Sequence, residues 1–138
     1  MNAPTINSGY LLLIRNDEWY NSMTADELRK ISEQAKSWFE RLAAQGKVTP
    51  GQGLVRGGAV VGKNGRTLTD GPFAEAKEVI GGYMILQADN LEEAISIAKT
   101  NPILAHGSTT IEVRPVAQEC PLDARLRELA EEAQLATA

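Results

Sequence analysis

A short apolar run near the start of the chain decides the fold. Residues 9–15 read Gly9-Tyr10-Leu11-Leu12-Leu13-Ile14-Arg15. Successive side chains of a strand point to opposite faces of its sheet, so a nearly continuous apolar run predicts a central strand covered on both faces. A second run, Tyr83-Met84-Ile85-Leu86, has the same character. We therefore expect one sheet that needs a cover on each face.

A long amphipathic helix is predicted over about 24–45. Thr24 and Glu27 form a capping box, in which each residue satisfies a backbone amide of the other. An apolar stripe at helical spacing follows: Leu28, Ile31, Ala35, Trp38, Phe39 and Leu42. We interpret Trp38 and Phe39 as core residues. In the loop before this helix, Trp19 and Tyr20 either pack down as a lid or line a pocket.

The dipeptide Asn64-Gly65 predicts a β-hairpin with a type I′ turn, because it lies between the two short runs at 58–62 and 66–69. The other predicted elements are a bent edge strand over 47–56, a strand over 83–88, a helix from Asn90 to about Thr100, a strand over 109–116 and a helix over 122–136.

Without the hairpin and the last helix, the order is β-α-β-β-α-β. This predicts an α+β, ferredoxin-like βαββαβ fold with an inserted β-hairpin and an extra C-terminal helix. Both internal helices would cover one face of the sheet. A second copy of the protein would cover the other, giving a homodimer that forms a dimeric α+β barrel. We divide the chain into an arm at 1–8, a domain at 9–117 and a helical extension at 118–138.

Composition narrows the possible functions. The chain has 138 residues, enough for one domain with a core of its own, and a net charge of −4 that argues against direct nucleic-acid binding. It has no apolar run of about 18 residues, so we expect no membrane span. Its single cysteine, Cys120, fits a reducing cytoplasm. One cysteine and one histidine are too few for the usual zinc site, and we expect no metal or cofactor.

The densest functional signal is the segment 69–78, which combines a forced Asp70-Gly71-Pro72 turn with several charges and one aromatic ring. Asp70 has two interpretations: a turn residue that accepts amide protons, or a carboxylate at a pocket mouth. His106 is the only histidine and is a candidate general acid or base, with Asp70 orienting it. An exposed or structurally bonded loop histidine is the alternative.

Four further residues are candidate ligand-binding groups: Phe73, Lys77, Tyr83 and Arg114. Lys77 could neutralise a carboxylate or phenolate, or pair with a neighbouring glutamate on the surface. Arg114 shares a sheet face with Glu112 and could bind an anion or form an ion pair.

The chain resembles the YCII-related domain family, in its DGPF subgroup, over about residues 9–116. The matching segments are Tyr10-Leu11-Leu12-Leu13-Ile14, Asp70-Gly71-Pro72-Phe73-Ala74-Glu75-Ala76-Lys77-Glu78, Gly81-Gly82-Tyr83, Asn101-Pro102, His106-Gly107 and Ile111-Glu112-Val113-Arg114-Pro115. The resemblance implies the dimeric ferredoxin-like barrel. In a related branch of the family, the proposed active site is a His–Asp pair, with the histidine on the first helix and the aspartate just before the proline that ends the second helix. In this chain the first predicted helix has no histidine, and the residue before Pro102 is Asn101. The resemblance therefore does not transfer that pair to this chain.

These observations leave two hypotheses open. One is a small-molecule binder with its pocket in the barrel. This binder either only holds its ligand or also catalyses acid–base chemistry of the lyase or isomerase type. The other is a non-catalytic interaction module, with residues 70–78 as its contact surface. The resemblance links the second hypothesis to sigma-factor signalling, because DGPF genes often neighbour those of sigma factors.

Overall fold

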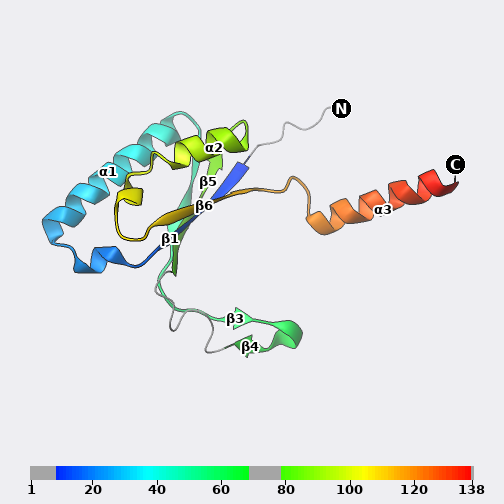
Figure 1. The fold of residues 1–138 in the computed structure, drawn as a ribbon, viewed down its shortest axis with the longest axis horizontal. Coiled ribbons are helices and arrows are strands. Elements are labelled where there is room, and N and C mark those ends of the chain that lie inside the picture. Colours follow the sequence, from blue (N-terminus) through cyan, green and yellow to red (C-terminus); the bar gives the residue numbers. More distant parts are fainter. Residues whose placement is uncertain (1–8, 69–78, 138) are drawn as a thin grey trace.

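The computed structural model describes residues 9–68 and 79–137. Its elements, in chain order, are β1 (Gly9–Asn16), η1 (Trp19–Ser22), α1 (Ala25–Ala44), β2 (Val48–Gly53), β3 (Val60–Val61), η2 (Lys63–Gly65), β4 (Thr67–Leu68), β5 (Val79–Gln87), α2 (Leu91–Ala98), η3 (Pro102–Ala105), β6 (Thr110–Pro115) and α3 (Pro121–Thr137) (Figure 1).

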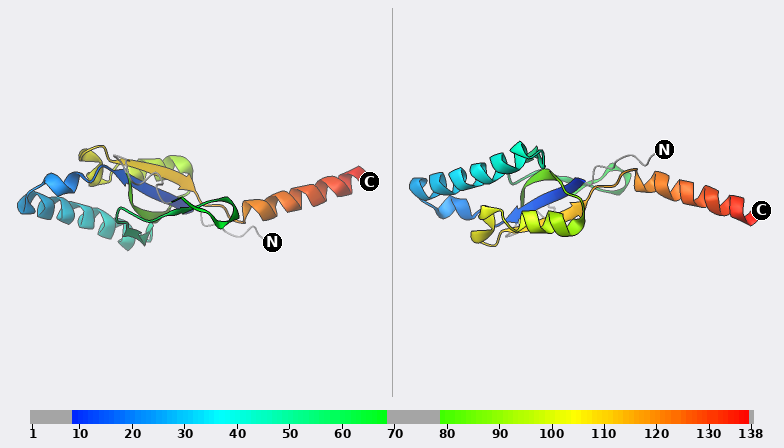
Figure 2. Two further views of the ribbon diagram at one scale, coloured as in Figure 1. Left: turned by 90° about the horizontal axis from the view of Figure 1, so that it is seen from below. Right: turned by 90° about the horizontal axis from the view of Figure 1, so that it is seen from above.

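Four of the described strands form one antiparallel sheet in the order β2-β5-β1-β6. Helix α1 connects β1 to β2 and helix α2 connects β5 to β6. Both helices lie on the same face of the sheet (Figures 1 and 2). The α+β class and the βαββαβ order expected from the sequence are confirmed, and the arrangement is that of a ferredoxin-like fold.

Helix α1 begins with the predicted capping box. The backbone N–H of Glu27 donates to Thr24 Oγ1 at 3.2 Å, and the N–H of Thr24 donates to the Glu27 carboxylate at 3.0 Å. The Glu27 carboxylate accepts from the Thr24 backbone N–H and also from the Thr24 hydroxyl, at 2.9 Å, and these two hydrogen bonds hold the pKa of Glu27 below its ordinary value. Further along, Trp38 and Leu42 are buried against Val48 of β2, so the predicted stripe does face the sheet.

The face of the sheet beneath the helices forms the main core. Tyr10 and Leu12 of β1 join Leu86 of β5 there, together with Ala94 and Ala98 of α2. Leu12 and Leu86 have 0% of their surface exposed. The small side chains of α2 let that helix approach the sheet closely, and this packing fixes α2 over β1 and β6.

The opposite face of the sheet carries apolar side chains along β1 and β5 but has no described helix over it (Figure 2). Leu11 and Leu13 alternate with the core residues of β1, and their partners across the ladder are Ile85 and Tyr83 of β5. Leu11, Leu13 and Ile85 are half-buried, and Tyr83 is exposed. We call this surface the open face.

Two irregularities bend the sheet near β2 and β5. The register of β1 and β5 shifts between Ile14 and Arg15, which leaves Gly81 as an extra residue. The register of β2 and β5 shifts between Thr49 and Gln52, in the predicted edge strand. A Cβ atom at Gly51, within that second shift, would overlap the carbonyl oxygen of Tyr83. The glycines therefore allow two backbones to approach closely.

The described chain outside the domain core consists of two projecting parts (Figure 1). Strands β3 and β4 pair with each other. In the turn between them Asn64 and Gly65 have φ of 62° and 73°, and Arg66 N–H donates to Lys63 C=O at 3.3 Å. This is the geometry of the type I′ turn that the sequence predicts. Helix α3, also predicted, extends away from the sheet.

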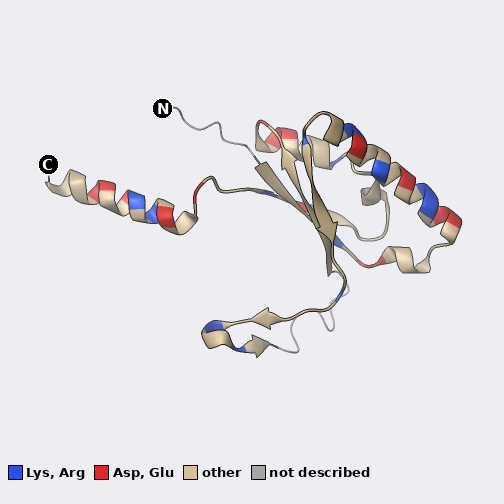
Figure 3. Cartoon of the chain, turned by 180° about the vertical axis from the view of Figure 1, so that it is seen from behind, with Lys and Arg blue, Asp and Glu red and all other residues tan. Residues whose placement is uncertain are grey.

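Charged residues of both signs follow one another along α1 and α3, while the central strands carry few (Figure 3). No helix in the described part of the chain is both long and apolar enough to cross a membrane.

Candidate functional site

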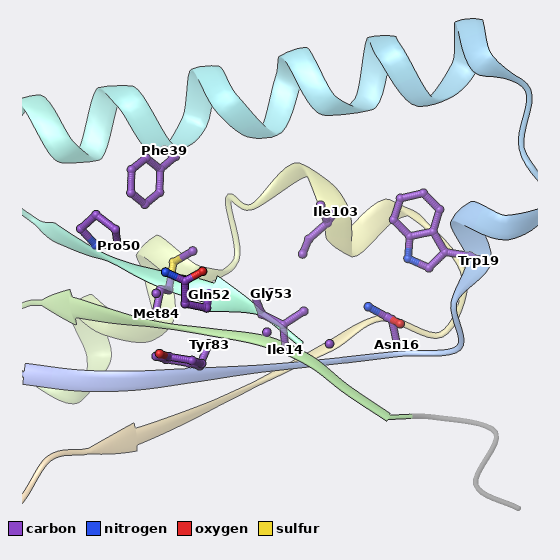
Figure 4. A pocket seen from close by; sticks show the side chains of 13 residues that line it. Ile14, Asn16, Trp19, Phe39, Pro50, Gln52, Gly53, Tyr83, Met84 and Ile103 are labelled. Atoms are coloured by element: carbon purple, nitrogen blue, oxygen red, sulfur yellow. The ribbon is translucent and has the colours of Figure 1, made fainter. Parts of the chain in front are cut away.

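A pocket of about 350 Å³ lies between α1 and the sheet, at the end of β1 that leads to η1 (Figure 4). Its lining comes from six elements, namely β1, β2, β5, α1, η1 and η3. Segments far apart in the sequence therefore converge on it, as expected for a binding site in a preformed fold.

The body of the pocket is apolar. Phe39 extends from α1 toward the sheet, Ile14 and Met84 rise from the strands, and Ile103 closes the side formed by η3 (Figure 4). The interpretation of Phe39 as a pure core residue is thus incomplete. Its neighbour Trp38 is in the core, but Phe39 is half-buried and lines the pocket, because the two side chains lie about 100° apart around the helix axis.

Trp19 supplies the polar edge of this pocket. Its indole nitrogen is completely buried and has no hydrogen-bond partner among the described residues. Figure 4 shows this nitrogen on the pocket side of the ring. The other tryptophan behaves differently, since Trp38 Nε1 donates to Thr100 Oγ1 at 2.7 Å. Leaving a buried donor unpaired costs about 1–3 kcal/mol, so a ligand that accepts from Trp19 would recover that energy.

Asn16 provides a second polar group beside Trp19. Its Oδ1 accepts a hydrogen bond from the backbone N–H of Glu18 at 3.0 Å, which orients the side-chain amide. The amide nitrogen then faces the pocket (Figure 4). A Cβ atom at Gly81 would stand 2.6 Å from this nitrogen, so only glycine leaves room for the observed orientation.

His106 lies behind Trp19. The two rings stack with centroids 4.8 Å apart and an angle of 27° between their planes. Gly107 follows with φ of 54°, and a Cβ atom there would come within 2.8 Å of Trp19 Cβ. The predicted site residue His106 thus stacks on Trp19 in the pocket wall without lining this pocket itself, and it lines a separate groove beside α1 together with Trp38 and Thr100.

Tyr83 and Arg114 lie apart from His106. Tyr83 borders the pocket as part of β5, but its ring lies on the far side of the strand from α1 (Figure 4). Arg114 belongs to the open face, where its register partner is Leu11. The other predicted site residues, Asp70, Phe73 and Lys77, lie outside the described residues. The structure therefore does not test their distances to His106 or to the pocket.

The open face carries a small ion cluster. Glu112 accepts from Arg15 at 2.6 Å with one carboxylate oxygen and from Arg114 at 3.1 Å with the other. The hydrogen bond from Arg15, and next the one from Arg114, hold the pKa of Glu112 below its ordinary value. The ion pair expected between Arg114 and Glu112 is therefore present, with Arg15 as an additional partner that the sequence did not indicate.

Within residues 9–68 and 79–137, no group of three or more His, Cys, Asp or Glu side chains could hold a metal ion. The described lining of the pocket also contains no charged side chain. Binding there would rest on apolar contact and on the two neutral donors, Trp19 and Asn16.

Sequence reasoning named Trp19 only as a lid or pocket residue and missed Asn16. A signal was present in part: an aromatic pair in a loop directly after a central strand is unusual enough to suggest a site. The role of Asn16 depends on the bulge at Gly81, which aligns two distant segments and has no local signature.

Comparison with known proteins places this geometry in a family. The YCII-related domain matches residues 9–119. The chain belongs to the YCII-related domain family. A relative named "Uncharacterized protein R00369", from Rhizobium meliloti (strain 1021), is 29% identical over 113 residues, which cover 78% of this chain and 91% of the relative. The match to the family spans the whole βαββαβ domain and ends before α3.

Proposed function

We propose that this YCII-related protein binds a small organic molecule in the pocket between α1 and the sheet. The observation that carries the proposal is the buried, unpaired indole N–H of Trp19 at the edge of an apolar cavity. Unpaired buried donors are rare in folded proteins and call for a physical explanation. A bound acceptor supplies one.

The lining indicates the kind of ligand. Phe39, Met84 and Ile103 favour an apolar or aromatic body, and the neutral donors of Trp19 and Asn16 favour a carbonyl or similar acceptor at one end. A carboxylate gains less here, because the described lining offers no positive charge to balance it.

A matched pair of probes tests this binding mode. Acetophenone and α-methylstyrene have nearly the same shape, but only acetophenone has a carbonyl oxygen. We expect acetophenone to bind more tightly by about fivefold, the value of one net hydrogen bond of about 1 kcal/mol. It should also shift the indole N–H resonance of Trp19 in NMR spectra, while that of Trp38 should stay in place.

The variant Trp19→Phe is the decisive control, since it retains an aromatic ring and removes the donor. The preference for acetophenone should shrink in this variant, where Asn16 is the remaining donor, and persist at full size in Trp38→Phe. Equal affinity of the native protein for both probes, or no binding of either, would refute the proposed site.

Proton-transfer chemistry of the lyase or isomerase type is the catalytic form of this proposal, with Asp70 and His106 as acid–base groups and Phe73, Lys77, Tyr83 and Arg114 as candidate ligand contacts. Its support is the contact of His106 with the pocket wall at Trp19. If Asp70 bonds to His106, the imidazole resonances should change in Asp70→Asn. The chain has a single histidine, so its imidazole resonances are assigned without ambiguity. Unchanged resonances in Asp70→Asn would refute the pairing of Asp70 with His106.

A homodimer built through the open face is also part of the proposal. The apolar side chains of Leu11, Leu13 and Ile85 on that face support it, since no described element covers them. Assignment to the DGPF subgroup rests on Asp70-Gly71-Pro72-Phe73 together with Glu112-Val113-Arg114-Pro115.

One observation favours a non-catalytic interaction module as a second candidate. Val55 is 92% exposed and Val61 is 67% exposed on the projecting arm formed by β3, β4 and the chain leading to them. If this arm and residues 70–78 contact a protein of a sigma-factor pathway, a pull-down should identify that protein. The double variant Val55→Ser/Val61→Ser, or charge reversal at Glu75 and Glu78, should abolish its recovery.

A further inference from the structure

Helix α3 exposes a row of leucines that the domain does not use. Leu122 is 67% exposed, Leu126 is 58% exposed and Leu129 is 45% exposed. With Ala133 they follow one another at intervals of four, three and four residues. This spacing places them on one side of a helix and is the a/d pattern of a two-helix seam. We call these four residues the leucine stripe.

Local interactions help α3 to remain helical where it projects. Pro121 occupies the first helical position. Arg127 pairs with Glu131 at 3.3 Å and Arg125 pairs with Glu128 at 3.3 Å, both at spacings that stabilise a helix. No residue of α3 is buried, and the helix points away from the sheet (Figures 1 and 2). The leucine stripe is therefore presented to a partner as a preformed surface.

We propose that α3 pairs antiparallel with α3 of a second copy of this chain. In an antiparallel seam, a positions face d positions of the other helix. Leu126 then lies opposite the partner's Leu129, and Leu122 lies opposite the partner's Ala133. Every member of the leucine stripe is covered by the same stripe of the other copy.

The charges beside the stripe select the antiparallel direction. In this alignment Arg125 lies next to the partner's Glu132, and the two-fold symmetry repeats the pair. In a parallel alignment the position across from Arg125 is the partner's Ala130, so the pairing is lost. Within one chain Arg125 lies 3.8 Å from Glu132, and both side chains are more than half exposed. That exposed contact is weak, and exchanging it for the intermolecular one costs little.

The native cysteine provides a direct measurement. Cys120 is the only cysteine, is exposed and directly precedes α3. Nitroxide labels on Cys120 of two full-length chains should give an electron-spin distance of about 25 Å in the antiparallel pair, against about 10 Å in a parallel one. Two helices of this length associate weakly, so the signal at this distance should grow as the protein concentration rises.

Variants of the leucine stripe test the assignment. Leu126→Ala/Leu129→Ala keeps good helix formers and should remove the 25 Å distance without changing the circular dichroism. Leu135→Ala, at a 77% exposed leucine outside the stripe, should leave it unchanged. Arg125→Glu should weaken the distance signal, and Arg125→Glu/Glu132→Arg should restore it.

The results that would overturn the pairing are distinct from those that concern the open face. A distance near 10 Å, the absence of any distance at high concentration, or a 25 Å distance that survives Leu126→Ala/Leu129→Ala would each reject the antiparallel pair.

Discussion

The two faces of the sheet carry similar side chains in different surroundings. Along β1, Leu12 lies under the helices with 0% of its surface exposed, while Leu13, the next residue, lies half-buried on the open face. Both are leucines of one central strand. The difference shows that hydrophobicity marks both faces for burial, whereas the connections between strands decide which face the chain covers by itself.

The largest effect is expected on the covered face. Leu12→Ala should lower the free energy of unfolding by about 2–5 kcal/mol, because it removes contacts and leaves a cavity in the core. Leu13→Ala should cost clearly less in the isolated chain. Urea unfolding of both variants at low protein concentration measures the comparison, and equal losses would show that the two faces are equally buried in solution.

A second prediction concerns the open face. A charge at Ile85 should prevent a second copy from covering this face. Ile85→Asp, made together with Leu126→Ala/Leu129→Ala to remove the α3 pair, should therefore convert a dimer into a folded monomer. Sedimentation at micromolar concentration measures the change, and Ser32→Asp, at an exposed position of α1, is the control. A native protein that already sediments as a monomer would contradict the proposed interface.

The smallest effect is expected at the ion cluster of the open face. Because the pKa of Glu112 is lowered in the folded protein, its carboxylate stabilises the fold at pH values above 4.5, the ordinary pKa of a glutamate. That contribution is lost as the pH falls through the lowered pKa. The stability difference between the native protein and Glu112→Gln should therefore shrink between about pH 6 and about pH 3. A constant difference over this range would mean that the pair with Arg15 does not persist in solution.

Much of the fold could be predicted because its signals are local. The capping box at Thr24, the turn at Asn64-Gly65 and the alternation in β6 each depend on a few neighbouring residues. Their order then limits the topology to few choices. The prediction that edge strand β2 is bent also followed from its own proline and glycines.

The site could be predicted only in part, since its geometry is tertiary. His106 was singled out as the one histidine, but its stacking on Trp19 joins residues 87 positions apart in the sequence. The orientation of Asn16 depends on the register shift at Gly81, which no periodicity announces. For Arg114 the shared face with Glu112 followed from alternation, whereas the contribution of Arg15 required the pairing of β1 with β6.

The close packing of Gly107 against Trp19 has a consequence for sequence variation. A residue such as Ile103, which lines the pocket but belongs to neither core cluster, can change size and merely reshape the pocket, so relatives can drift at this position while retaining the site. A relative with any larger residue in place of Gly107 or Gly81 must move the indole or the amide of Asn16. Two positions without side chains thus offer a simple criterion for deciding which family members share a ligand class with this protein.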